Sequence, residues 1–197
     1  MEKHEQIELF KERARAVQTL VTDASALHQA LQYAVEVTKE QGGSVMAAPA
    51  LGPVECSQLA ELCRQADITL VTENMRDHIG KIQTGLTLSD WGIAETATLV
   101  MDSTSEDVRI VTMLSETHVA VLSSSRIKSE AMELESELSE SMKSAPRYFA
   151  FISGASRTAD IERVLTIGVH GPQELHVLIL DEEPAWTKGS NPSGEEP

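Results

Sequence analysis

Residues 151–162 read FISGASRTADIE, an apolar run that passes into a loop of small residues and then into a helical pattern. Ser156 is a residue type that caps helices, and the apolar residues 161, 164 and 165 recur at the spacing of a helix with one buried face. We therefore predict a strand over 148–152 and a helix over 158–167. A strand, a tight turn and a helix in succession are typical of α/β sheets, whose ligands bind beyond the ends of strands.

The rest of the chain extends this pattern in both directions. Apolar residues three and four apart predict helix over 3–40, broken into two near 22–25, and Gly42 and Gly43 end it. Short apolar runs separated by polar links predict strands, and the close spacing of three runs between residues 97 and 122 favours antiparallel pairing. The predicted strands are 44–48, 68–72, 97–101, 109–114, 118–122 and 176–180, and the further predicted helices are 57–66 and 129–143.

These elements predict an α/β fold with a mixed, mainly parallel sheet flanked by helices, an N-terminal helical segment and an antiparallel insertion. We expect residues 1–42 to form the helical segment, packed on an α/β domain of residues 43–181. Residues 182–197 are rich in Pro, Gly, Ser and Glu, a composition typical of a flexible acidic tail.

The charge and the cysteines exclude several functions. The formal net charge of −15 opposes general binding to nucleic acid or to anionic lipid. The chain has two cysteines, Cys56 and Cys63, whose spacing fits no common zinc or iron–sulfur motif. We expect no metal, no bound cofactor and no membrane insertion. A charged N-terminus without an apolar core predicts a cytoplasmic protein.

The loop at residues 153–158 carries groups suited to an anion. A helix that begins there would offer free N–H donors, to which Ser153, Gly154, Ser156 and Thr158 add hydroxyl or close backbone donors. Arg157 adds a forked cation that suits phosphate or carboxylate. The alternative is a well-capped helix without a ligand, and the acidic residues 160 and 162 favour it, since they would partly neutralise the arginine.

Glu95 and the adjacent Thr96 form a second candidate site. If the strand includes residue 95, Glu95 shares the more apolar face with Ile93 and Leu99, where an unpaired charge is costly. It would then need a partner, a raised pKa or a place at the strand mouth, any of which makes it a candidate catalytic base. If instead the strand starts after residue 95, Glu95 is a solvated loop residue.

Histidines provide the third candidate. His170 lies in the turn Gly168–Val169–His170–Gly171–Pro172, where its ring either reaches a pocket beside Gly171 or holds the turn together. His118 and His176 open predicted strands, so we expect them to be edge or core residues. Ser123–Ser124–Ser125–Arg126 either helps to bind an anion or forms a helix-entry turn.

Four stretches together resemble the LUD-domain family of lactate-utilisation proteins, also described as lactate-utilisation C or YkgG-like: residues 92–98 (GIAETAT), 118–121 (HVAV), 153–161 (SGASRTADI) and 168–172 (GVHGP). The resemblance implies a fold similar to ribose-5-phosphate isomerase A, formyltetrahydrofolate cyclo-ligase and CoA transferases. The family positions that carry over are Glu95, Ser153, Ser156, Arg157, Thr158, Asp160 and His170. Ala97 and Ala155 stand where relatives are expected to have Gly and Pro.

The resemblance also implies a role beside two partner proteins that oxidise L-lactate to pyruvate and hold the iron–sulfur clusters. We therefore expect a lactate-utilisation protein that serves as an accessory subunit of an L-lactate-oxidising iron–sulfur complex. The alternative is a small-molecule enzyme or sensor that binds a phosphorylated or carboxylated ligand at residues 153–158. The resemblance supplies no catalytic mechanism, so whether the chain is an enzyme stays open.

Overall fold

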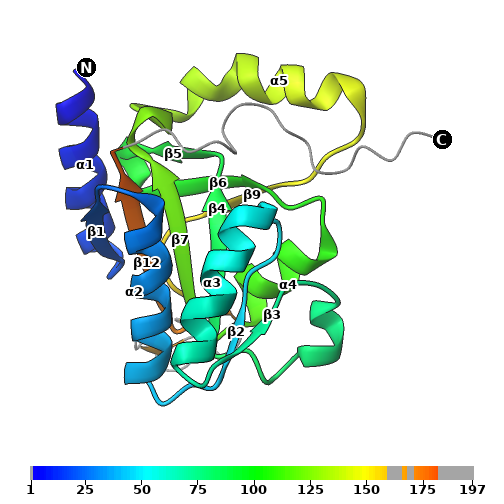
Figure 1. The fold of residues 1–197 in the computed structure, drawn as a ribbon. Coiled ribbons are helices and arrows are strands. Elements are labelled where there is room, and N and C mark those ends of the chain that lie inside the picture. The colour runs from blue at the N-terminus through cyan, green and yellow to red at the C-terminus, as the bar shows by residue number, and fades with distance from the viewer. Residues whose placement is uncertain (1, 159–165, 168–170, 182–197) are drawn as a thin grey trace.

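A computed structural model describes residues 2–158, 166–167 and 171–181 of the 197-residue chain. Its main element is a six-stranded sheet in which every neighbouring pair of strands is parallel (Figure 1). Parallel strands are buried on both faces and therefore consist of nearly continuous apolar runs. In spatial order the strands are β1 (Leu20–Ala24), β12 (Glu174–Leu180), β7 (Thr117–Ser123), β4 (Thr84–Ser89), β2 (Val45–Ala47) and β3 (Thr69–Val71).

The order of the strands locates two features of the sheet. The chain runs from β2 outward to β3, returns to place β4 on the other side of β2, and then continues to β7 and β12. The direction of winding therefore reverses between β2 and β4, which is where open α/β sheets form ligand crevices at strand carboxyl ends. At the opposite edge, β1 pairs with β12, so the first and last described strands lie side by side.

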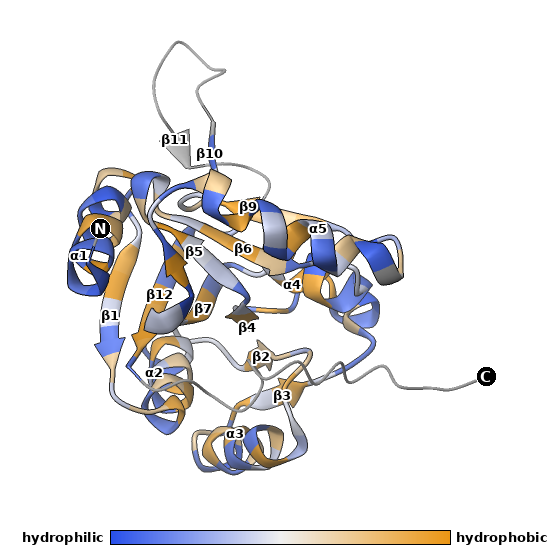
Figure 2. Ribbon diagram, turned by 90° about the horizontal axis from the view of Figure 1, so that it is seen from above, coloured by the Kyte–Doolittle hydropathy of each residue, from blue (hydrophilic) through white to orange (hydrophobic). Residues whose placement is uncertain are grey.

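Helices cover one face of this sheet, and a mixture of helices and a second sheet covers the other (Figure 2). α2 (Leu27–Glu40) and α3 (Pro53–Gln65) pack on the first face through buried aliphatic side chains that include Leu31 and Leu59. α1 (Lys3–Ala16) and α4 (Glu106–Leu114) pack on the second, where Phe10 is fully buried. α4 lies so close to β4 that a Cβ on Gly85 would stand 2.5 Å from Cγ1 of Val111.

The second sheet has four strands, in the order β8 (Ile127–Lys128), β5 (Trp91–Ile93), β6 (Thr98–Asp102) and β9 (Phe149–Ile152). β6 pairs antiparallel with both β5 and β9, whereas β5 and β8 are parallel. Its inner face, with Leu99 and Ile152, packs on the main sheet. Its outer face lies under the 3₁₀ turn η4 (Ala131–Leu134) and α5 (Glu135–Ser144), where Leu134 is fully buried against Trp91 and Val100.

These observations confirm the predicted fold class, a mixed α/β fold with a mainly parallel sheet and an antiparallel insertion. The strands at 44–48, 68–72, 97–101, 118–122, 148–152 and 176–180 are confirmed within one or two residues. The helix predicted over 57–66 begins earlier, at Pro53, so Ser57 does not cap it. The acidic helix predicted over 129–143 is present as η4 followed by α5.

Three predicted elements are wrong. Residues 20–24 are strand β1 rather than part of a helix, because they complete the main sheet beside β12. Residues 109–114 lie in α4, so they form no antiparallel pair with β7, which is parallel to both of its neighbours. The helix predicted over 158–167 is absent at both ends, where β10 (Arg157–Thr158) pairs antiparallel with β11 (Thr166–Ile167). The predicted tail, residues 182–197, lies outside the described residues. Within the described part of the chain, no helix has both the length and the apolar character needed to cross a bilayer.

Candidate functional site

The segment at residues 153–158 is a loop and a short strand, not the beginning of a helix. Arg157 and Thr158 form β10, so free N–H groups of a helix N-terminus are not what this segment offers. The backbone N–H of Ser156 donates to the Pro172 carbonyl at 2.8 Å, and that of Gln173 donates to the Glu116 carbonyl at 2.8 Å. Because β12 and β7 begin just after residues 173 and 116, the segment lies at the amino-terminal ends of the strands of the main sheet. The ligand crevices of parallel sheets lie at the carboxyl-terminal ends of the strands.

The Arg157 guanidinium links three segments of the chain. It donates to Oε1 of Gln18, from Nη2 at 2.8 Å and from Nε at 3.2 Å. It also donates to the backbone carbonyls of Ser156, at 2.9 Å, and Gln173, at 3.3 Å. Gln18 has a left-handed backbone (φ 57°) in the turn between α1 and β1. Arg157 therefore holds that turn against the start of β12, a structural role that occupies most of its donors.

Two glycines allow the close approaches around this segment. Gly154 has φ +77°, and a Cβ there would lie 2.9 Å from the Val17 carbonyl oxygen. Gly171 has φ +101°, and a Cβ there would lie 3.1 Å from Cβ of Ser156. The structure thus brings Ser156 and Gly171 together. His170, whose ring was expected either to reach a pocket beside Gly171 or to hold the turn together, lies outside the described residues, as do the acidic residues 160 and 162.

Glu95 lies in the 3₁₀ turn η2 (Ala94–Thr96), before β6 begins at Thr98. Its side chain is exposed, and its Oε1 accepts a hydrogen bond from the Ala131 N–H at 3.1 Å. Its own N–H donates to the Ser129 carbonyl at 3.1 Å. The alternative in which the strand starts after residue 95 is therefore confirmed. The carboxylate is directed to the start of η4 rather than into the apolar core.

Thr96 and Ser153, both predicted ligand residues, are connected through a third hydroxyl. Oγ1 of Thr98 lies 2.7 Å from Oγ1 of Thr96 and 2.6 Å from Oγ of Ser153. Thr98 is buried, with 6% of its surface exposed, whereas Thr96 and Ser153 are exposed. Sequence reasoning missed Thr98. Its available signal was the spacing of Thr96 and Thr98, two hydroxyl residues two positions apart and next to the candidate Glu95.

A cluster of charged side chains at the carboxyl end of β4 was also missed. Oδ2 of Asp90 accepts the Asp102 N–H at 2.6 Å, and Asp102 is ion-paired with Arg147. Burial raises the pKa of Asp90, against the hydrogen bond from Asp102 and the nearby charges of Arg126 and Arg147. Burial also acts to raise the pKa of Asp102, but hydrogen bonds from Thr104 and Arg147 hold it below its ordinary value.

This cluster, Asp90, Asp102, Arg126 and Arg147, adjoins the point where the sheet reverses its winding. Its charges are balanced, two carboxyls against two guanidinium groups, and it joins the ends of β4 and β6 to the segment before β9. A buried carboxyl directly after an apolar parallel strand was the available signal, since strand ends are where such sheets place functional groups. We assign it a structural role because each carboxyl already has a partner within the protein.

His118 and His176 were expected to be edge or core residues, and both are core residues. His118 is fully buried in β7, where Nε2 lies 2.7 Å from Oγ1 of Thr87 and burial lowers the pKa to about 4. In the described part of the chain its Nδ1 has no hydrogen-bond partner. His176 bonds the Tyr33 hydroxyl at 2.9 Å and Oε2 of Glu174 at 3.0 Å, which fixes α2 to β12.

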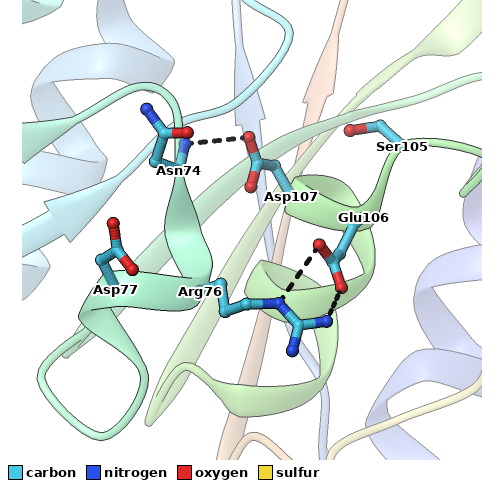
Figure 3. Close-up of a pocket in the computed structure, with 6 residues that line it drawn as sticks. All are labelled: Asn74, Arg76, Asp77, Ser105, Glu106 and Asp107. Atoms are coloured by element: carbon cyan, nitrogen blue, oxygen red, sulfur yellow. Dashed lines mark hydrogen bonds and ion pairs between the residues drawn. The ribbon is translucent and has the colours of Figure 1, made fainter.

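A surface hollow of about 340 Å³ lies elsewhere, between the 3₁₀ turn η1 (Met75–His78) and the start of α4 (Figure 3). Its polar groups interact with each other. Asp107 accepts the N–H groups of Asn74, at 3.2 Å, and Met75, at 2.9 Å, and Arg76 is ion-paired with Glu106. None of the predicted site residues lines it.

Potential metal ligands are dispersed in the described ranges. No group of three or more His, Cys, Asp or Glu side chains there is placed to hold a metal ion. Both cysteines lie on α3 and are free thiols. Cys63 is fully buried, and burial raises its pKa to about 11.

Comparison with known proteins agrees with this fold. The LUD domain model matches residues 7–180. Lactate utilization protein C 1 of Bacillus mycoides is 34% identical over 102 residues, which cover 50% of this chain and 44% of that protein. Lactate utilization protein C of Anoxybacillus flavithermus is 26% identical over 183 residues, which cover 90% of this chain and 81% of that protein.

The aligned region thus spans less than half the length of the first of these relatives. A crystal structure of a DUF162 family protein from Deinococcus radiodurans has the same fold, with a TM-score of 0.61 and 19% identity, and the match covers 91% of this chain and 99% of that one. Since the family model covers nearly the whole described chain, the chain belongs to the LUD-domain family.

Proposed function

We propose that this protein takes part in lactate utilisation as an accessory subunit of an L-lactate-oxidising iron–sulfur complex. The observation that carries the proposal is the match of residues 7–180 to the LUD domain, together with relatives named lactate utilization protein C. We call the subunit accessory because two candidate site residues, Glu95 and Arg157, already have hydrogen-bond partners within the protein.

The thiols of this chain support assigning the iron–sulfur clusters to partner proteins. Cysteine ligates iron as the thiolate, and a typical cluster needs four such ligands. The chain has two cysteines, and the raised pKa of buried Cys63 opposes formation of its thiolate. In this proposal the protein contributes binding surface and positioning, and the partners carry the electrons.

Purification from the native host tests the proposal. A chromosomally tagged chain would be isolated from cells grown on L-lactate, and from cells grown on another carbon source as the control. We expect iron, acid-labile sulfide and L-lactate-dependent dye reduction to copurify with the tag in the lactate-grown cells only. A clean deletion should abolish growth on L-lactate. Normal growth of the deletion strain, with a tagged chain free of redox proteins, would refute the proposal.

The alternative function is an enzyme or sensor for a phosphorylated or carboxylated ligand. The helix N-terminus that motivated it is replaced by β10, and Arg157 is engaged by Gln18 and two backbone carbonyls. The exposed hydroxyls of Thr96 and Ser153 still favour a polar ligand nearby. If such a ligand binds at Arg157, the Arg157→Ala variant should lose the thermal stabilisation that the ligand gives.

A further inference from the structure

Three hydroxyl groups form a chain of hydrogen bonds on the surface next to α1. Thr98 lies in the middle, 2.7 Å from Thr96 and 2.6 Å from Ser153. Each hydroxyl has one proton to donate, so three hydroxyls that share two hydrogen bonds leave one proton unused; when Thr98 accepts from one end residue and donates to the other, that proton lies at an end of the chain. Hydrogen bonds in a row polarise one another, which strengthens the donor at that end. Because both end residues are exposed, the free donor can reach a ligand.

Arg13 of α1 lies on the side of the helix that faces this chain. Gln6, two turns earlier on the same side, donates to Oγ of Ser129 at 2.9 Å. Val17, one turn later, lies against Gly154. Side chains four and seven residues apart lie on one side of a helix, so Arg13 shares a side of α1 with Gln6 and Val17, and α1 as an element contacts η2.

The Arg13 guanidinium also differs from that of Arg157. It is exposed, and within the described ranges it has neither an ion pair nor a hydrogen-bond partner. Glu95, the acidic residue of η2, turns its carboxylate to the Ala131 N–H instead. In a chain with a net charge of −15, an exposed guanidinium on the side of α1 that faces η2 is a local positive site.

We propose that Arg13, Thr96 and Ser153 bind the carboxylate of a small organic acid, with Thr98 orienting the two end hydroxyls. A guanidinium presents parallel N–H donors that match the two oxygens of a carboxylate, and the end hydroxyl adds a donor beside them. The choice of L-lactate as the first probe rests on the proposed function. The inference that a carboxylate binds at this place does not depend on that function.

The test is a titration of the full-length ¹⁵N-labelled chain with sodium L-lactate, followed by amide NMR, with sodium pyruvate and inorganic phosphate in parallel. We expect both carboxylates to shift the amides of residues 96, 98, 153 and 154. Arg13→Ala should weaken binding about ten- to hundred-fold, the loss of one charge-assisted hydrogen-bonding partner. Arg15→Ala, the same change on another side of the same helix, is the matched control and should leave the affinity unchanged.

A second variant tests the role of the hydroxyl chain. Thr98→Val keeps the shape of the buried side chain and removes the middle hydroxyl, so we expect binding to weaken several-fold while the unliganded spectrum stays that of the folded protein. No shift with either carboxylate, equal losses in Arg13→Ala and Arg15→Ala, or a response to phosphate alone would each overturn the proposal. A chain that binds no carboxylate but copurifies with redox proteins would leave the proposed function standing.

Discussion

Acid should destabilise this protein through His118. Its imidazole is fully buried, and burial lowers its pKa from 6.5 to about 4. In the unfolded chain the ring takes up a proton as the pH falls through 6.5, whereas in the folded protein it stays neutral until about pH 4. The free energy of unfolding therefore has its full value above pH 6.5, and the part of it that is linked to His118 is lost as the pH falls from 6.5 to 4. The difference between the two pKa values corresponds to about 3 kcal/mol, and the slope inside this window approaches about 1.4 kcal/mol per pH unit.

The measurement is the free energy of unfolding in urea, determined every half pH unit from 7.5 to 4.5. His118→Gln is the variant of choice because its amide can still bond the Thr87 hydroxyl and does not titrate. Carboxyl groups titrate alike in both proteins, so the difference between the two curves isolates His118. His28→Gln, at an exposed position on α2, is the matched control and should follow the wild type. If the wild type and His118→Gln run parallel from pH 6.5 to 4.5, the reasoning is refuted.

Three further changes test other contacts. Arg157→Ala should lower the free energy of unfolding by about 1–2 kcal/mol, because charged hydrogen bonds to carbonyls are lost; Arg157→Lys should not rescue it, and wild-type stability in both would contradict the linking role. Gly154→Ala should cost about 1–3 kcal/mol, since φ +77° strains alanine and its Cβ would meet Val17; an unchanged urea midpoint would show that the turn adjusts freely. Arg147→Met should cost about 1 kcal/mol at pH 7 by leaving Asp102 without its cation. That cost should shrink as the pH falls through the lowered pKa of Asp102, and a pH-independent cost would assign the effect to packing.

The sequence predicted those elements whose apolar pattern is local. β7 and β12 are nearly continuous apolar runs, and buried parallel strands have that composition. Part of α4 was predicted to be a strand because its residues include several β-branched side chains, a type that favours strands: Val108, Ile110, Val111 and Thr112. In the fold Ile110 and Val111 pack with residues of β2 and β3, and Val108 packs with residues of the second sheet, so tertiary packing outweighs intrinsic preference. β1 was missed because Leu20 and Val21 continue the helical spacing of the residues before them.

The candidate site could be predicted only as a set of residues. Thr96 and Ser153 were chosen separately, yet their connection through Thr98 spans 55 residues of sequence, which no spacing rule covers. The contact of Arg157 with Gln18 spans 139 residues, and it turns an expected ligand contact into a structural link. Arg13 had no distinguishing sequence pattern, because its significance depends on what α1 faces. Local chemistry identified the donors, and long-range packing decided which of them are free.

The pairing of β1 with β12 has a consequence for how the chain is made. β12 lies between β1 and β7, so the two sides of the main sheet stay separate until residues 174–180 have left the ribosome. Until then β1 has no neighbouring strand and β7 presents an open, apolar edge, which is a hazard for aggregation. The completed sheet depends on contacts across most of the chain, a topology that folds slowly. A stop codon shortly before residue 174 would therefore remove a central strand rather than trim a terminus, and the shortened product should be cleared by proteolysis.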